Sequence, residues 1–380
     1  MPKNKLLKTT AKIAKTLTIS GLAYHFWYQK NANLIRTNPG EIELPNEEPI
    51  PLDWVDSQHY GEAMEQKVKP YIEKYRKQQV LPLNAYPIAI DTYQLPNPDQ
   101  TLLIVHGFNE YKEKFHELIY YFLQANIQVV VYDQRGHGFS KIDENQTQIN
   151  IKDFNEYVVD LNHIIHQIVL PMSQNNPLIL FGHSMGGAVV TSYLIKEEPT
   201  IVDAVVLNAP MIEIETGKYP QSLSHLVSHL MSQTPFGNLY IPTTEAYDPQ
   251  IHTLFNADND LTHYPVRNEY THYLNNSLHK IPTRGGSYHW LATSLSHLWE
   301  IRKPENIKKI KQAVLLFRAE DDVIVGAEGI FTLNQYLPKV TPIFVPNSKH
   351  EIFQENDQIV QAYISQIIKF IRETTQKPNV

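Results

Sequence analysis

Short apolar runs alternate with helical patterns along most of this chain, and no other feature constrains its fold as strongly. Apolar residues at helical spacing predict helices at residues 112–127, 152–170, 186–197 and 357–374. The runs that predict strands lie at residues 100–108, 128–134, 177–183, 202–210, 311–322 and 340–348. This order is typical of an α/β protein with a mostly parallel central sheet and helices on both faces.

The alternation is interrupted by roughly ninety residues, which is too long for a simple loop in a compact domain. Residues 211–303 carry many Pro, Asn, His, Tyr and Thr and show no strand–helix pattern. We expect this stretch to be a cap, or lid, inserted into the sheet. The predicted division is an N-terminal arm (1–45), a first core part (46–210), the cap (211–303) and a second core part (304–380).

Composition excludes several classes of function. The net charge is -7, with 33 basic and 40 acidic residues in no long like-sign block, which argues against nucleic acid as the main partner. The chain has no cysteine, so disulfides, thiolate nucleophiles and Cys-based metal sites are excluded. No apolar run approaches the ~20 residues that a transmembrane helix requires.

Residues 1–30 allow three interpretations. Five lysines and no acidic residue occur by residue 15, and Leu6, Ile13 and Leu17 share one face of a helix. The simplest interpretation is a loosely docked arm, and the first alternative is a basic amphipathic helix on an anionic membrane. A secretory signal fits less well because Lys15 and His25 interrupt its apolar centre. We therefore expect a cytoplasmic protein, with peripheral attachment to the inner face of the membrane as the alternative; the oligomeric state is not predicted.

A serine lies where one predicted strand passes into a helix. Gly182-His183-Ser184-Met185-Gly186 fits the pattern Gly-x-Ser-x-Gly, which forms a tight, strained turn in this context. Side chains at positions 182 and 186 would collide with the neighbouring strand and helix. We expect the turn to hold the Ser184 hydroxyl clear of the sheet as a nucleophile, rather than to use it only as a helix cap.

A nucleophilic serine needs a base and an orienting carboxylate, which follow it in the order acid, then histidine, on this type of sheet. Asp321 and Asp322 directly follow a late predicted strand. We select Asp322 as the acid because it leads straight into the next helix, although Asp321 could take its place. His350 is the predicted base, because it alone among the histidines lies between the last strand and the closing helix.

Hydrogen-bond donors for a developing oxyanion are expected from two backbone positions. The first is the N–H of Met185, directly after the nucleophile, and the second is the N–H of Phe108, where Gly107 lets the backbone turn inward. We interpret His106 as a hydrogen-bonding group beside the site. Residues 132–140 are interpreted as a glycine-rich turn with an internal Asp133–Arg135 pair, and neither residue is assigned to catalysis.

The insertion contains candidate substrate contacts that its sequence leaves open. Arg267 and Arg284 could meet a lipid phosphate or be surface charges, and we assign neither. His289 and His297 are interpreted as structural. A further set could line a slot for an acyl chain or pack the cap against the core: Leu226, Leu230, Met231, Phe236, Tyr240, Tyr288, Trp290, Leu291 and Trp299.

Together these motifs resemble the serine hydrolases of the α/β-hydrolase fold, and within them the bacterial lysophospholipase and monoacylglycerol lipase branch. The likeness covers roughly residues 85–372. The core motifs that carry it are GHSMGG, HGFNE, YDQRGHGFS, DDVIV and KHEIFQE. Within the insertion, NAPMIEIETG, DNDLTHYPVRNEY and RGGSYHWLATSL resemble the lysophospholipase members in particular.

The resemblance implies hydrolysis of a single acyl chain from a glycerol-based lipid, without a cofactor or a metal. We expect a carboxylic ester hydrolase that acts through an acyl-enzyme on Ser184, with His350 and Asp322, and whose substrate is a lysophospholipid. Monoacylglycerol lipase or general carboxylesterase activity is the alternative, as is acyl transfer from the same intermediate. A lipid-binding protein without catalysis would lack part of the triad, and no part is missing here.

Overall fold

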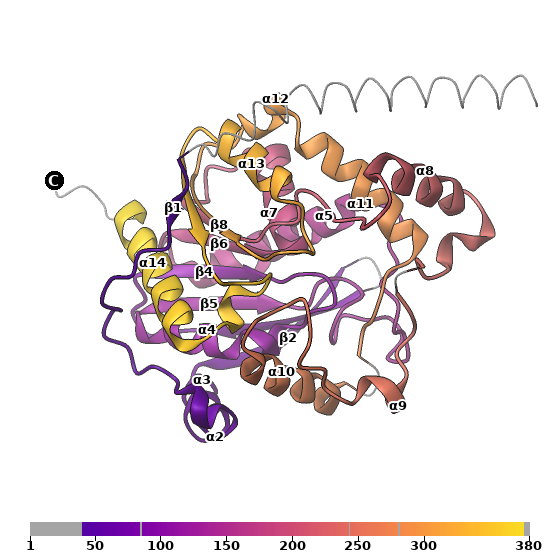
Figure 1. Ribbon diagram of the computed structural model, residues 1–380. Coiled ribbons are helices and arrows are strands. Elements are labelled where there is room, and N and C mark those ends of the chain that lie inside the picture. Colours follow the sequence, from indigo (N-terminus) through magenta and orange to yellow (C-terminus); the bar gives the residue numbers. More distant parts are fainter. Residues whose placement is uncertain (1–39, 84–85, 243, 280–281, 376–380) are drawn as a thin grey trace, which may run out of the picture. The chain divides into compact units, whose positions relative to one another are not determined.

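The computed structural model describes residues 40–83, 86–242, 244–279 and 282–375 (Figure 1). Glu41–Val380 forms one compact unit. The interpretations of residues 1–30 lie outside the described residues and stay predictions. None of the described helices has both the length and the apolar character needed to cross a bilayer.

The compact unit is built on a nine-stranded sheet with the order β1-β9-β8-β7-β6-β4-β5-β3-β2 among the described residues. Neighbouring strands pair in parallel from β1 to β5 in this order. At the other end of the sheet, β3 pairs antiparallel with β5 and β2 pairs antiparallel with β3. The strands are β1 (Ile42–Glu43), β2 (Arg76–Leu83), β3 (Tyr86–Tyr93), β4 (Gln100–Val105), β5 (Ile127–Tyr132), β6 (Leu178–His183), β7 (Ala204–Asn208), β8 (Ala313–Ala319) and β9 (Val340–Val345).

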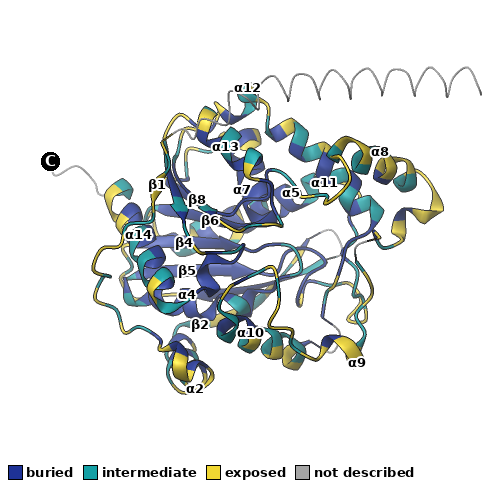
Figure 2. Cartoon of the chain, in the orientation of Figure 1, coloured by how far each residue is buried: buried dark blue, intermediate teal, exposed yellow. Residues whose placement is uncertain are grey.

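Helices cover both faces of the sheet, and alternate strand residues point to opposite faces. In β4, Leu103 and Val105 join a buried cluster with α5, α7 and α13, whereas Leu102 and Ile104 join a second cluster with α3, α4 and α14. Figure 2 shows the strands buried between these layers. The core helices include α3 (Lys69–Ile72), α4 (His116–Gln124), α5 (Asn155–Ile164), α6 (Leu170–Ser173), α7 (Met185–Glu197), α13 (Ala327–Tyr336) and α14 (Asp357–Thr375).

The short helical turns complete the core. They are η1 (Ser57–His59), α2 (Tyr60–Ala63), η2 (Met64–Val68), η3 (Lys112–Phe115), η4 (Ile165–Val169) and η6 (Ile352–Gln354). The predicted α/β architecture with a mostly parallel sheet is therefore confirmed.

The hairpin β2–β3 and the turns before it were not predicted from the sequence. β2 forms one end of the sheet and reads RKQQVLPL, with several exposed positions and a proline. Proline is tolerated on an edge strand, where one row of backbone groups has no neighbouring strand to pair with. A strand of this kind has little apolar alternation, so its sequence resembles a loop.

The insertion between β7 and β8 is largely helical. Its helices are α8 (Gln221–Ser232), η5 (Pro235–Asn238), α9 (Pro249–His252), α10 (Pro265–Leu278), α11 (Tyr288–Ile301) and α12 (Pro304–Ile307). α8 packs along α11, while α10 packs against α2 and η6 of the core. In Figure 1, α8 and α11 lie together at one side of the insertion, and α9 and α10 lie at the other. Whether the insertion moves as a lid stays a prediction.

Candidate active site

Ser184 occupies a strained turn between β6 and α7. Its φ of 52° and ψ of −121° lie outside the regions that non-glycine residues ordinarily adopt, and such strain costs about 1–3 kcal/mol. The turn is held from both sides, because Ser184 N donates to Asn208 O at 3.0 Å and Met211 N donates to Ser184 O at 2.8 Å. The neighbouring strand β7 and the chain that follows it therefore fix the position of the serine.

The glycines of the motif are required by close packing, as the sequence predicts. A Cβ on Gly186 would lie 2.0 Å from the carbonyl oxygen of Val105, at the end of β4. A Cβ on Gly182 would lie 2.8 Å from the Cα of Gly187, in the first turn of α7. Any side chain at either position would push the strand, the helix and the serine between them apart.

His350 and Asp322 meet on two loops that follow adjacent strands. The Nδ1–H of His350 donates to Asp322 Oδ2 at 2.7 Å, and both side chains are almost fully buried. Asp322 Oδ1 also accepts from Ile324 N at 2.9 Å and from Val325 N at 3.1 Å. Burial opposes the charge of this carboxylate, but the bonds from His350 and the two amides outweigh it and lower the pKa of Asp322.

Asp321 points away from His350. Its Oδ2 accepts from the Nε2–H of His263, in the insertion, at 2.8 Å, and about half of its side chain is exposed. Asp321 lies in the turn directly after β8, where His263 engages its carboxylate, whereas the carboxylate of Asp322 is the one bonded to His350. The geometry favours Asp322 over Asp321 as the partner of His350.

The loop of His106, Gly107 and Phe108 lies against the serine. A Cβ on Gly107 would come within 2.9 Å of the Ser184 Cβ. His106 fixes this loop, because its Nδ1–H donates to Gly107 O at 2.8 Å and its Nε2 accepts from Gln134 N at 2.9 Å. Burial lowers the pKa of His106 to about 4, so the ring is neutral at pH 7 and holds a single tautomer.

A buried ionic cluster lies beneath the site and was not found by sequence reasoning. Lys114 Nζ lies 2.8 Å from Glu110 Oε1 and 2.5 Å from Glu351 Oε1. Glu110 also accepts the N–H of Gly107 through a short hydrogen bond. Lys114 thus joins the loop of Gly107 to Glu351, the residue next to His350. The available signals were Glu110 and Lys114 four residues apart and a glutamate directly after the histidine.

One ammonium in this cluster faces two carboxylates. Burial alone would raise the pKa of Glu110, but the charge of Lys114, with help from His183, lowers it to about 2. Burial opposes the charge of Lys114 as well, yet the two carboxylates raise the pKa of its ammonium. Glu110, His183 and Glu351 offer ligand atoms within 4.8 Å of one another. We assign this group to the ammonium rather than to a metal ion, because Lys114 already bridges both carboxylates.

The predicted Asp133–Arg135 pair is wrong. Asp133 instead accepts from the backbone N–H of Lys112 and of Phe139, both at 2.8 Å. Arg135 binds Asp160 at 2.8 and 2.7 Å, on α5, and Glu156 on the same helix. Asp133 does stabilise the turn, but it does so through amides, because the two side chains leave the turn in different directions.

Arg267 is neither a free headgroup ligand nor a surface charge. Its side chain is 1% exposed and donates to Glu117 at 3.0 Å and to Asp357 at 2.7 Å. This ion pair joins α10 of the insertion to α4 and α14 of the core. Arg284 is 45% exposed and lies 3.9 Å from Glu245, so it remains at the surface.

The apolar residues of the insertion divide into two groups. Trp290 is buried, and its ring lies 4.1 Å from the ring of Phe108, so α11 packs onto the loop beside the serine. Leu230 and Phe236 are each 57% exposed. They belong to a set of exposed apolar residues in and beside α8 and η5, which we call the apolar surface and which consists of Tyr219, Leu223, Val227, Leu230, Phe236 and Leu239. Figure 2 shows exposed positions along α8.

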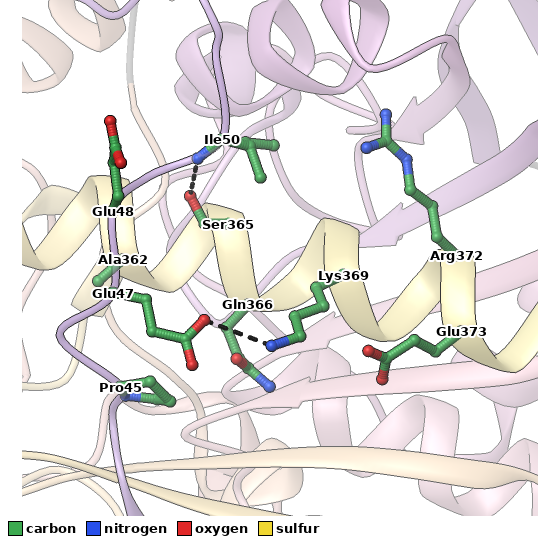
Figure 3. A pocket seen from close by; sticks show the side chains of 10 residues that line it. All are labelled: Pro45, Glu47, Glu48, Ile50, Ala362, Ser365, Gln366, Lys369, Arg372 and Glu373. Atoms are coloured by element: carbon green, nitrogen blue, oxygen red, sulfur yellow. Dashed lines mark hydrogen bonds and ion pairs between the residues drawn. The ribbon is translucent and has the colours of Figure 1, made fainter.

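A separate pocket of about 200 Å³ lies between the segment Pro45–Ile50 and α14 (Figure 3). Its lining mixes both signs of charge, and Glu47 already pairs with Lys369 at 3.3 Å. Ile50 N donates to Ser365 Oγ across it at 3.1 Å. Its lining includes none of Ser184, Asp322 and His350, so this pocket is a gap beneath the N-terminal segment rather than part of the site.

Comparison with known proteins links the sequence of this chain to one family. The family model described as serine aminopeptidase, S33, matches residues 96–357. The chain is 28% identical over 270 residues to a probable lysophospholipase L2 of Haemophilus influenzae, covering 71% of this chain and 83% of that one. It is 25% identical over 295 residues to lysophospholipase L2 of Escherichia coli, covering 75% and 84%. A monoacylglycerol lipase of Mycolicibacterium smegmatis is 27% identical over 164 residues, covering 43% and 56%.

Solved structures share the fold. A soluble variant of monoglyceride lipase from Saccharomyces cerevisiae superposes with a TM-score of 0.64 at 16% identity, covering 80% of this chain and 97% of that one. A carboxyl esterase from Bacillus coagulans gives 0.64 at 18% identity, covering 79% and 99%.

Proposed function

Because the chain belongs to the serine aminopeptidase S33 family of α/β hydrolases and is a carboxylic ester hydrolase, we propose that it releases the fatty acid from a lysophospholipid. Ser184, His350 and Asp322 carry the reaction. The observation that supports this assignment most directly is the 2.7 Å hydrogen bond between His350 and Asp322. The ring of His350 also lies 4.9 Å from that of His183, the residue before the strained serine.

In the first step, Ser184 Oγ attacks the ester carbonyl while the Nε2 of His350 takes the hydroxyl proton. The Asp322 carboxylate accepts the Nδ1–H of His350, which leaves Nε2 free as the acceptor and stabilises the imidazolium that forms. The lysophospholipid's alcohol then leaves with that proton, and an acyl-enzyme remains. Water, deprotonated by His350, releases the fatty acid and restores the serine.

The oxyanion of each tetrahedral intermediate is bound by the backbone N–H groups of Met185 and Phe108. Met185 is the first residue of α7, so its N–H has no acceptor within the helix. Phe108 follows Gly107, whose own N–H is held by Glu110 and whose carbonyl is held by His106. The bond to the Gly107 carbonyl holds the same peptide group that presents the Phe108 N–H, and the bond to the Gly107 N–H holds the peptide group before it.

Two relatives named lysophospholipase L2 align along most of their length, which favours a lysophospholipid over a neutral monoacylglycerol. A panel of lysophosphatidylcholine, lysophosphatidylethanolamine, monoacylglycerol and p-nitrophenyl esters tests this choice through kcat/KM. We expect the highest value for a lysophospholipid. A higher value for monoacylglycerol would assign the monoacylglycerol lipase alternative instead.

The insertion is proposed to act as the cap, and its apolar surface along α8 and η5 to contact the lipid aggregate. Between Glu215 and Glu245 the chain has no acidic residue, so this surface would not repel an anionic membrane. We propose a cytoplasmic protein with peripheral membrane attachment, to which this surface contributes in addition to the attachment predicted for residues 1–30. Leu223→Asp with Val227→Asp should reduce sedimentation with phosphatidylglycerol vesicles, while turnover of p-nitrophenyl acetate is unchanged. Equal sedimentation of the variant and the unmodified protein would contradict the proposed contact.

A further inference from the structure

One segment of the insertion lies directly on the loop that carries His350. We call residues 259–268 the brace and residues 348–355 the base loop. The two are joined by several hydrogen bonds: Glu351 N to Leu261 O at 2.8 Å, Thr262 Oγ1 to Gln354 O at 3.0 Å, Lys349 Nζ to Asn259 O at 2.6 Å and Asn268 Nδ2 to Gln354 Oε1 at 2.9 Å.

A buried carboxylate strengthens this junction. Glu355 is fully buried, and its side chain accepts the N–H of His263 in the brace at 3.1 Å. The same carboxylate accepts the N–H of Lys349, directly before His350, at 2.9 Å. One side chain therefore links the brace to the residue that precedes the proposed base.

The brace also reaches the loop that carries Asp322. His263 Nε2–H donates to Asp321 Oδ2 at 2.8 Å, and Asp321 N in turn donates to Ser348 O at 2.9 Å. His263 therefore contacts the acid loop through its side chain and the base loop through its backbone. The two loops that must stay in register for the His350–Asp322 bond are thus held by one residue of the insertion.

We propose that Thr262 and His263 are positioning residues, which hold the loops of His350 and Asp322 in the geometry for proton transfer. This inference rests on the triad of the proposed function. Loops are more mobile than the strands that they follow. A displacement of about 1 Å in a catalytic group can cost about a hundredfold in rate. The motif Asp-Asn-Asp-Leu-Thr-His, which resembles a segment of the lysophospholipases, therefore positions the triad rather than binding the acyl chain. The brace part of the insertion stays fixed while the enzyme turns over.

Two variants test this role, one at a buried position and one at a partly exposed position. Thr262→Val keeps the shape of a buried side chain and removes its hydroxyl, whereas His263→Ala changes a side chain that is 44% exposed and removes the contact with Asp321. The control is His272→Ala on α10, whose ring contacts Thr253, Phe255 and Tyr273 within the insertion. Thr262→Ser restores the hydroxyl. All four proteins are compared with the unmodified chain on p-nitrophenyl acetate and p-nitrophenyl dodecanoate, after circular dichroism has verified the fold.

We expect kcat to fall roughly ten- to hundredfold in Thr262→Val and His263→Ala, by the same factor for both esters, with KM within about twofold. Thr262→Ser and His272→Ala should keep the unmodified rate. A loss confined to the dodecanoate would place these residues in the acyl site and overturn the inference, as would unchanged kcat in His263→Ala. If the unmodified protein and Ser184→Ala hydrolyse the esters equally, the proposed function itself is contradicted, and so is the positioning role proposed for Thr262 and His263.

Discussion

At the scale of single residues, the site depends on a serine in a backbone conformation that the surrounding structure imposes. Ser184 has a positive φ, and the bonds from β7 and from Met211 hold it there. The carbonyl of Val105 approaches Gly186 so closely that only glycine fits. The strain is therefore maintained by tertiary contacts, and the serine side chain stays at the end of the sheet.

The two adjacent aspartates give a matched pair of variants. Asp322→Asn removes the acceptor that orients His350 and should lower kcat for p-nitrophenyl acetate by roughly ten-thousandfold. Asp321→Asn changes a half-exposed side chain that faces His263, and should lower kcat by no more than the His263→Ala variant does. Steady-state kinetics on both proteins decides the assignment. A larger loss in Asp321→Asn would exchange their roles.

The three candidates for the triad were predicted from their positions relative to the predicted strands. Ser184 lies at a strand-to-helix turn, Asp322 follows a late strand and His350 follows the last one, and each position follows from strand order alone. Reasoning failed for Asp133 and Arg135, which were paired because they are near in sequence. Arg135 turns instead to α5, and only the packed structure brings that helix within reach.

At the scale of elements, the loops around the site are joined by buried charges. Lys114, in η3, connects the loop of Gly107 with the base loop through Glu110 and Glu351. A buried ammonium between two carboxylates is costly to remove, because the charges left behind have no compensation.

Lys114→Met should therefore lower the free energy of unfolding by about 3–5 kcal/mol. The matched control is Lys369→Met, which removes a half-exposed lysine paired with Glu47 at 3.3 Å and should cost less than about 1 kcal/mol. Urea denaturation measures both. Equal losses in the two variants would show that the cluster does not stabilise the fold.

The strands that are most deeply buried were the ones that the sequence predicted. Strands buried on both faces, such as β4 and β6, read as apolar runs and were found. The edge strand β2 and the short strand β1 have exposed positions, so their sequences carry no comparable signal. The helices of the insertion were missed as elements because polar and aromatic residues interrupt their apolar faces, as in α10.

At the scale of the whole molecule, many histidines are buried or half-buried in the neutral form. Burial lowers the pKa of each well below its usual value of about 6.5. It falls to about 4 or about 3 in His106, His137, His183, His225, His279 and His297. The unfolded chain binds protons at these sites as the pH falls below about 6.5, whereas the folded chain does not.

The stability that these groups contribute is thus fully present above pH 6.5 and is lost as the pH falls towards 4. Asp133 acts in the opposite direction, because burial raises its pKa to about 7. Burial also raises the pKa of Asp160, Glu213 and Glu351, but the six histidines outnumber these four carboxyl groups. We expect the urea midpoint to be clearly lower at pH 5 than at pH 7.5. A midpoint that is unchanged or higher at pH 5 would show that these rings are protonated in the folded state.

The most direct test of the convergence of Ser184, His350 and Asp322 is covalent labelling with a fluorophosphonate, followed by peptide mass spectrometry. An activated serine reacts with this reagent, and an ordinary surface serine does not. We expect one adduct, on the peptide that contains Ser184, which is absent in Ser184→Ala and forms far more slowly in His350→Ala. An adduct at another serine, or labelling of Ser184 at the same rate without His350, would contradict the proposed site.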